Sequence, residues 1–163
     1  MRYFLSVSQK FYLMDKTDKA LLRALQENAK LTNKELAAQL GLTITPVHER
    51  IKKLEREGYI SHYSAVVNPQ KVGLALHVFC SVSLKDHQKE FIEQFERDVM
   101  ALEEVLECYH IGGQFDYLLK VMVKDMETYR MFVSQKLSEL DNIGNVQSSF
   151  VMSEIKRSAG LPF

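Results

Sequence analysis

The stretch LTNKELAAQLGLTITPVHERIKKLEREGYI, residues 31–60, decides the fold of the N-terminal third of this 163-residue chain. It predicts two short helices joined by a tight turn. Thr32 and Glu35 have the spacing of a capping box, in which each side chain satisfies a free backbone N–H at the helix start. Gly41 ends this helix, because glycine tolerates the left-handed backbone of a sharp turn. The next helix follows within two residues, with Thr43 as its expected cap.

The second of these helices is amphipathic. Pro46 falls in its first turn, where a missing N–H does no harm. Apolar residues at i, i+4 and i+7 form its inner face (Val47, Ile51 and Leu54), and Gly58 ends it. A further helix precedes both, capped by Asp15 and with an apolar stripe of Leu21, Leu22 and Leu25. The first third of the chain therefore predicts three helices.

The outward face of the helix after Gly41 has the composition of a DNA-recognition helix. Short polar groups for base edges come first and cations for phosphates follow. Ala37 is small enough to let the two helices cross closely. The residues of this face are Thr45, His48, Glu49, Lys52, Lys53 and Arg56. The alternative is an ordinary helical hairpin with a solvated charged face.

The net charge of zero hides an asymmetry between the two parts of the chain. Residues 1–62 carry eleven Lys and Arg against seven Asp and Glu, a balance of +4, and residues 63–163 carry ten against fourteen, a balance of −4. A basic N-terminal part on an acidic remainder is typical of a DNA reader attached to a domain with another task. This charge difference is modest, and it adds to the composition of the helix after Gly41 as a second indication of DNA binding.

After Gly58 the hydrophobic period changes from 3.6 to 2 residues. Residues 59–68 read as a short β-like segment, and strands are expected at 76–84, 105–111 and 117–124. A last strand carries Val146, Ser148, Phe150 and Met152. Two amphipathic helices lie between strands, one marked by Phe91, Phe95, Val99 and Leu102, the other by Met126, Tyr129, Val133, Leu137 and Leu140.

This order is β-α-β-β-α-β, the ferredoxin-like arrangement. The fold class is therefore α+β: an N-terminal three-helix, winged-type helix-turn-helix domain and a C-terminal ferredoxin-like sandwich. The usual strand order keeps the first two strands apart, so Cys80 and Cys108 should not be neighbours. We expect both to be buried, reduced thiols.

The predicted domains follow from these patterns. The helix-turn-helix domain spans 14–63, a linker 64–74, the ferredoxin-like domain 75–156 and a tail 157–163. Residues 1–13 precede these domains. They are either a genuine N-terminal arm or the result of a start codon assigned too early, in which case Met14 is the first residue. No apolar run reaches the roughly 20 residues that a bilayer span requires, and residues 1–14 make a poor signal peptide. We expect a cytoplasmic protein.

The sequence resembles the leucine-responsive/asparagine regulator family (Lrp/AsnC) in both parts. Residues 31–60 are similar to its helix-turn-helix, notably the core T-x-x-P-V-x-x-R-x-x-x-L-E-x-x-G-x-I. GGQFDYLLKV (112–121) looks like the family's G-x-x-D-Y-L-L segment, and NVQSSFVMSEIK (145–156) looks like its final strand. The match runs from about Met14 to Lys156 in the family's domain order. The resemblance implies a sequence-specific, DNA-binding transcription regulator.

On the family pattern the DNA-binding residues lie on the helix after Gly41. Thr45, His48 and Glu49 are expected at base edges, and Lys52 and Lys53 at phosphates. Arg50 has two equal readings: it binds phosphate, or it pairs with neighbours of Glu49 and holds the helix in place. The whole set is Thr43, Thr45, Pro46, His48, Glu49, Arg50, Lys52 and Lys53.

The family resemblance also implies an effector site around the Gly112-Gly113 turn, where two dimers meet. Glycines expose backbone N–H groups that suit an α-carboxylate, and Asp116 can pair with an α-ammonium. By position, the site comprises His110, Gly112, Gly113, Gln114, Asp116, Met126, Ser149, Phe150 and Val151. From the residues alone, a structural turn closed by Asp116 is the stronger reading. Departures from the family at Gln114 and His110 leave the effector open, including the possibility of none.

The implied partners are double-stranded DNA with a palindromic operator, a small-molecule effector, typically an amino acid, and further copies of the chain as a dimer and an octamer of four dimers. We expect nucleoid association and no membrane partner. No cofactor or metal is expected, since the five histidines are scattered without metal-ligand spacing. An enzyme is disfavoured because no nucleophile elbow, P-loop or dinucleotide-binding motif is present. A metabolite-binding regulatory subunit without DNA function is the other alternative.

Overall fold

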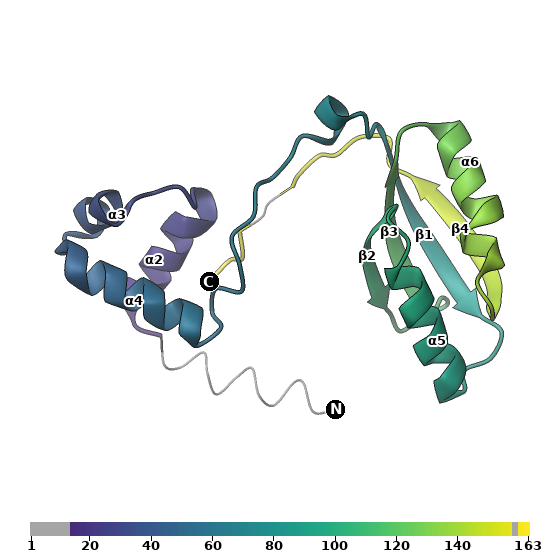
Figure 1. Cartoon of the computed structure of the whole chain (residues 1–163), viewed down its shortest axis with the longest axis horizontal. Coiled ribbons are helices and arrows are strands. Elements are labelled where there is room, and N and C mark those ends of the chain that lie inside the picture. The colour runs from purple at the N-terminus through teal and green to yellow at the C-terminus, as the bar shows by residue number, and fades with distance from the viewer. Residues whose placement is uncertain (1–13, 158–159) are drawn as a thin grey trace. The chain divides into compact units, whose positions relative to one another are not determined.

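The computed structural model describes residues 14–157 and 160–163, so the two readings of residues 1–13 fall outside it. The chain forms two compact units (Figure 1). One contains the described residues up to Val66 together with the described part of Lys156–Phe163, and the other contains Val67–Ile155. Within the described ranges, no helix is both long enough and apolar enough to cross a membrane.

The N-terminal unit is built from three helices: α2 (Lys16–Glu27), α3 (Asn33–Leu40) and α4 (Ile44–Arg56). Two of the three predicted N-terminal caps form their side-chain hydrogen bonds. The Asp15 carboxylate accepts a hydrogen bond from the backbone N–H of Asp18, and Thr32 forms a reciprocal capping box with Glu35. Gly41 has φ +65° and ends α3 as expected. Thr43 occupies the cap position of α4, but its side chain makes no capping hydrogen bond.

The core of this unit comes from the apolar stripes that the sequence indicates. Its buried residues are Leu21, Leu22, Leu36, Ala37, Val47, Ile51 and Leu54. The C-terminal tail adds to it, since Phe163 packs against this core and the Leu161 N–H donates to Gln26 Oε1 at 2.6 Å. The Arg23 guanidinium donates to the Phe163 main-chain oxygen and lies 5.9 Å from the centre of its ring.

The prediction of a β-like segment at residues 59–68 is wrong. These residues form no strand; Asn68 instead caps the 3-10 helix η1 (Pro69–Val72). The backbone N–H groups of Tyr59 and Ile60 donate to Leu54 and close the end of α4. Alternating residues adopt a stable strand only where another strand pairs with them, and none of the described residues pairs here.

The second unit has the predicted β-α-β-β-α-β order. Its elements are β1 (Leu76–Leu84), α5 (Lys89–Met100), β2 (Val105–His110), β3 (Tyr117–Val123), α6 (Met126–Gln135), the 3-10 helix η2 (Leu137–Glu139) and β4 (Ile143–Phe150). The four strands form one antiparallel sheet in the order β2-β3-β1-β4. α6 ends before the expected Leu140, and β4 ends before Met152, which is fully exposed.

Both long helices cover the same face of the sheet (Figure 1). Alternate residues of β1 and β3 point into the core beneath them, among them Val78, Val82, Leu119 and Val121. Strand β3 separates β1 from β2, so Cys80 and Cys108 both lie opposite Leu119 on different strands and do not bond to each other. Cys80 is buried as expected, whereas Cys108 is only half-buried. Burial raises the pKa of both thiols, which keeps them protonated.

Candidate nucleic-acid interface and ligand-binding loop

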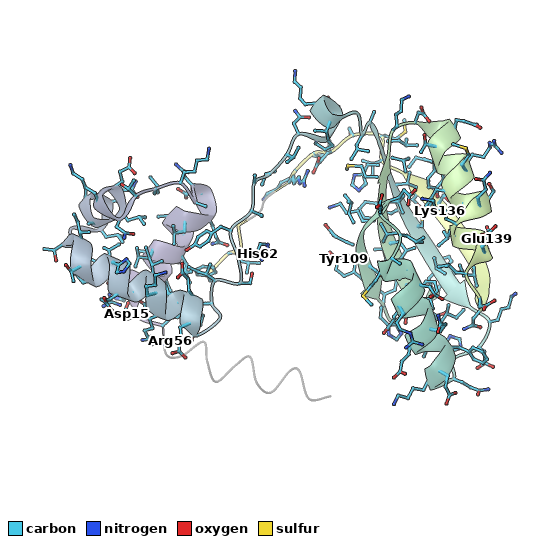
Figure 2. All side chains as sticks on the ribbon, viewed as in Figure 1. Asp15, Arg56, His62, Tyr109, Lys136 and Glu139 are labelled. Atoms are coloured by element: carbon cyan, nitrogen blue, oxygen red, sulfur yellow. The ribbon has the colours of Figure 1, made fainter. Side chains whose placement is uncertain are left out.

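Helix α4 presents its predicted DNA-binding residues to solvent. Val47, Ile51 and Leu54 are buried against α2 and α3, so the opposite face is outward by helical geometry. Thr43, Thr45, His48, Glu49, Lys52 and Lys53 are all exposed, and Pro46 is half-buried. Figure 2 shows the polar side chains of this helix, with Arg56 labelled near its end. The structure thus brings most of the predicted set together on one helix.

Arg50 is held on the flank of α4 next to the start of α2. Its Nη1 donates to Asp15 Oδ2 at 2.5 Å and to Asp18 Oδ1 at 2.7 Å. The Asp18 side chain is only 5% exposed, so it needs this cation to compensate its buried charge. The bond to Asp18 is the main cause of the raised pKa of Arg50. This geometry matches the helix-holding alternative, but the partners are residues of the first helix rather than neighbours of Glu49.

His48 lies on the other flank of α4. Its ring nitrogen Nδ1 is 3.2 Å from the amide nitrogen Nδ2 of Asn33, the first residue of α3. Beyond it along the helix, Lys52 Nζ and Glu55 Oε2 form an ion pair at 3.0 Å, and the Tyr63 hydroxyl donates to Glu55 Oε1 at 3.0 Å. Lys52 is the main reason that the pKa of Glu55 is lowered. Lys53 has no ion pair with any described residue.

The Gly112-Gly113 loop joins β2 to β3 at one end of the sheet. The Ile111 N–H donates to the Asp116 carbonyl at 2.8 Å and the Asp116 N–H donates to Val82 at 2.9 Å, which closes the loop. Gly113 has φ +148°, a backbone region that favours glycine. None of the described hydrogen bonds uses the backbone N–H of Gly112, Gly113 or Gln114, and all three residues are exposed.

The Asp116 carboxylate is already engaged within the chain. Oδ2 accepts the backbone N–H of Leu84 at 2.8 Å, and Oδ1 lies 2.9 Å from His87 Nε2. The Leu84 N–H is the main cause of the lowered pKa of Asp116, and His87 adds to it. His110 stacks on the buried ring of Tyr117 with 4.7 Å between ring centres. Asp116 therefore closes its turn whatever else it binds.

The other predicted effector residues lie at the opposite end of the same sheet. Phe150 pairs with Val78 and the Val151 N–H donates to His77, whereas the loop of Asp116 adjoins Val82 and Leu84. Four residues of β1 separate the two levels, about 13 Å along the strand. Met126 begins α6 at this second end, where β3 has just finished. One copy of the chain does not bring the two groups together.

The residues around Phe150 also divide between the two faces of the sheet. Phe150 packs its ring edge-on against Tyr129 of α6, 5.3 Å between ring centres. Ser149 pairs with Phe79 and lies on the face that carries no helix. Adjacent strand residues alternate in direction, so the predicted trio 149–151 does not line a single pocket within one chain.

Sequence reasoning missed several partners of the predicted residues. Asn33, Asp18 and His87 contact His48, Arg50 and Asp116 respectively. Only Asp18 had a local signal, because Asp15 and Asp18 have the spacing of a capping box. The described residues contain no group of three His, Cys, Asp or Glu that could hold a metal ion.

Comparisons with known proteins agree with both units. Residues 77–161 match the family described as Lrp/AsnC ligand binding domain, and residues 14–61 match the winged helix-turn-helix DNA-binding family. The leucine-responsive regulatory proteins of Salmonella typhimurium and Escherichia coli are each 38% identical over 145 residues, covering 89% of this chain and 88% of theirs.

Solved structures give the same result. A transcriptional regulator from Neisseria meningitidis, crystallised as a complex with L-Met, is 39% identical, covers 91% of this chain and 96% of its own, and superposes with a TM-score of 0.88. An AsnC family transcriptional regulator from Agrobacterium tumefaciens is 37% identical, covers 91% of this chain and 97% of its own, and has a TM-score of 0.87.

Proposed function

The chain belongs to the Lrp/AsnC family of DNA-binding transcription regulators, and from this premise we propose how its residues bind DNA and an effector. Helix α4 enters the major groove of an operator. Thr45, His48 and Glu49 contact base edges, while Lys52 and Lys53 contact phosphates. Thr43 and Pro46 shape the helix start, and Arg50 holds the helix against α2. The exposure of this face along one helix supports the assignment.

We propose that the helix-free face of the sheet forms a dimer. It carries apolar and aromatic side chains that no described helix covers, including Phe79, Tyr109, Leu118 and Met122. A dimer supplies two helix-turn-helix units, which suits a palindromic operator, because one such unit grips few base pairs. Four dimers then build an octamer. The protein would act in the cytoplasm, with the nucleoid.

We further propose an amino acid as effector, bound at the 112–116 loop. The backbone N–H groups of Gly112, Gly113 and Gln114 are available for an α-carboxylate. The outer side of Asp116 would accept the α-ammonium. His110 lies beside this loop, whereas Met126, Ser149, Phe150 and Val151 lie at the far end of the sheet. Those of the four that reach the effector would therefore come from neighbouring copies, so the site forms only in an assembly.

The observation that carries this proposal is that α4 exposes polar side chains for DNA while the 112–116 loop exposes backbone N–H groups for an effector. Native mass spectrometry with each of the twenty amino acids, with and without random genomic DNA fragments, tests it. We expect DNA complexes of even subunit number and one amino acid that shifts their distribution. An amino-acid complex without any DNA binding would support the alternative of a regulatory subunit. No effect of any amino acid would contradict the effector assignment.

A further inference from the structure

Asn33 fixes the hydrogen-bonding character of His48. The amide nitrogen Nδ2 of Asn33 carries two hydrogens and only donates, so the His48 Nδ1 that faces it at 3.2 Å accepts. A neutral imidazole carries a single proton. With Nδ1 as the acceptor, that proton lies on Nε2, and the ring presents an N–H donor on its other side.

The surroundings leave that donor available. None of the described hydrogen bonds uses Nε2 of His48, and the side chain is exposed. His48, Lys52, Glu55 and Tyr63 line the same hollow of about 310 Å³ beside α4. The only acidic group among them, Glu55, already accepts from Lys52 and Tyr63. No described hydrogen bond joins Glu55 to the ring of His48, so Nε2 remains available to a base.

We propose that Asn33 is a positioning residue for DNA specificity, which holds His48 as an Nε2 donor that reads guanine in the major groove. The inference rests on the proposed role of α4 as the recognition helix. In the major groove guanine offers two adjacent acceptors, N7 and O6, and no amino donor, whereas adenine sets an amino donor beside its N7, cytosine offers an amino donor alone, and thymine sets a methyl group beside its O4. His48 is thus a specificity residue, and Asn33 acts through it from the start of the preceding helix.

Selection of bound sites from a random DNA pool tests the base preference directly. We expect the wild-type site to contain a guanine whose selection is lost in His48→Ala. Replacing this guanine by 7-deazaguanine removes the N7 acceptor and keeps the base pair. It should weaken wild-type binding about fivefold to tenfold and leave His48→Ala binding unchanged. Lys53→Ala serves as control, since loss of a phosphate contact lowers affinity for every site and leaves the selected sequence intact.

Asn33→Asp tests the positioning role separately. A carboxylate at residue 33 accepts a hydrogen bond from Nδ1–H, so the neutral ring would then present Nε2 as an acceptor. We expect this variant to lose its guanine preference and favour an amino-bearing base, adenine or cytosine.

The charged groups beside His48 cannot cause the change of base preference expected for Asn33→Asp. Lys52, Glu55 and Tyr63 are present in wild type and variant alike, so only the change at residue 33 distinguishes the two base preferences. Asn33→Asp should also fold, because an acidic residue is favourable in the first turn of a helix. Circular dichroism of the full chain checks this.

Three outcomes would overturn the proposal. The first is a wild-type site whose guanine preference survives His48→Ala, since another residue then reads it. The second is wild-type binding that 7-deazaguanine does not weaken. The third is a folded Asn33→Asp protein that selects the wild-type sequence. In each case, DNA binding itself persists, so the failure would be one of specificity and not of the regulator function.

Discussion

The two candidate sites differ in how much of each lies in one copy of the chain. The outward residues of α4 occupy three turns of a single helix, and the flanks of this helix are tied to the rest of the N-terminal unit by Arg50 and by His48. The predicted effector residues lie at two ends of one sheet, about 13 Å apart along a strand. The predicted DNA-binding surface is therefore complete in one copy of the chain, whereas the proposed effector site requires a second copy.

This difference has a physical origin. A helix repeats every 3.6 residues, so residues close in sequence share a face and act together. A site at a sheet end draws instead on residues that are far apart in sequence, as Asp116 and His87 are here. Placing the effector site between copies gives a ligand different affinity for different assemblies, which is the condition for allosteric control. On the proposed function, DNA binding therefore uses residues of one copy of the chain, and effector binding uses residues of several copies.

The largest expected effect comes from removing the clamp on α4. Arg50→Met leaves the buried Asp18 carboxylate without its cation, and we expect the free energy of unfolding of the N-terminal unit to fall by about 2–3 kcal/mol. Hydrogen exchange measures this locally: amides of α2 and α4 should exchange faster, while those of β1 and β3 keep the wild-type rate. If the amides of both units lose protection equally, the effect of Arg50 is not confined to the N-terminal unit, which would contradict this prediction.

A second substitution shows whether Arg50 also touches DNA. Adding Asp18→Asn to Arg50→Met removes the uncompensated charge and should restore part of the lost stability. If Arg50 only holds the helix, this double variant keeps the wild-type salt dependence of DNA binding. A shallower salt dependence, by about one unit, would assign Arg50 a phosphate contact as well.

Sequence patterns predicted the fold well because it depends on local rules. Capping at Asp15 and Thr32, the left-handed Gly41 and the alternation of β1 are each set by a few neighbouring residues. The segment 59–68 failed for a non-local reason. Its residues alternate, but a strand also needs a partner, and the pattern says nothing about whether one is near.

The predictions of the two sites show the same difference between local and non-local features. The outward face of α4 could be written down from helical spacing, whereas the pairs Asn33–His48, Asp18–Arg50 and His87–Asp116 span 15, 32 and 29 residues. No local pattern encodes such contacts. The assignment of 149–151 as one lining also overlooked that adjacent strand residues face opposite sides of the sheet.

An intermediate effect is expected at Asp116, where the structural and sensing roles can be separated. Asp116→Asn keeps an oxygen that can accept the Leu84 N–H but loses the negative charge, and Asp116→Ala loses both. If the carboxylate binds an α-ammonium, both variants should bind the amino acid at least about tenfold more weakly. Isothermal titration calorimetry measures this. Asp116→Asn with normal amino-acid affinity would assign Asp116 a structural role alone.

The smallest expected effect is at Lys53, on the reading surface itself. Lys53 is exposed and has no ion pair with any described residue, so Lys53→Ala should leave the stability of the unit within about 0.5 kcal/mol of wild type. It should weaken binding to every DNA sequence and reduce the slope of log affinity against log salt by about one unit, because one fewer phosphate is neutralised.

Lys52→Ala is the matched comparison. The Lys52 ammonium is paired with Glu55, so removing it frees a carboxylate near the DNA and should cost more affinity than Lys53→Ala. Fluorescence anisotropy across a salt series measures both variants. An unchanged slope in Lys53→Ala would remove Lys53 from the phosphate-binding set and limit the reading surface to the side of α4 that carries His48 and Lys52.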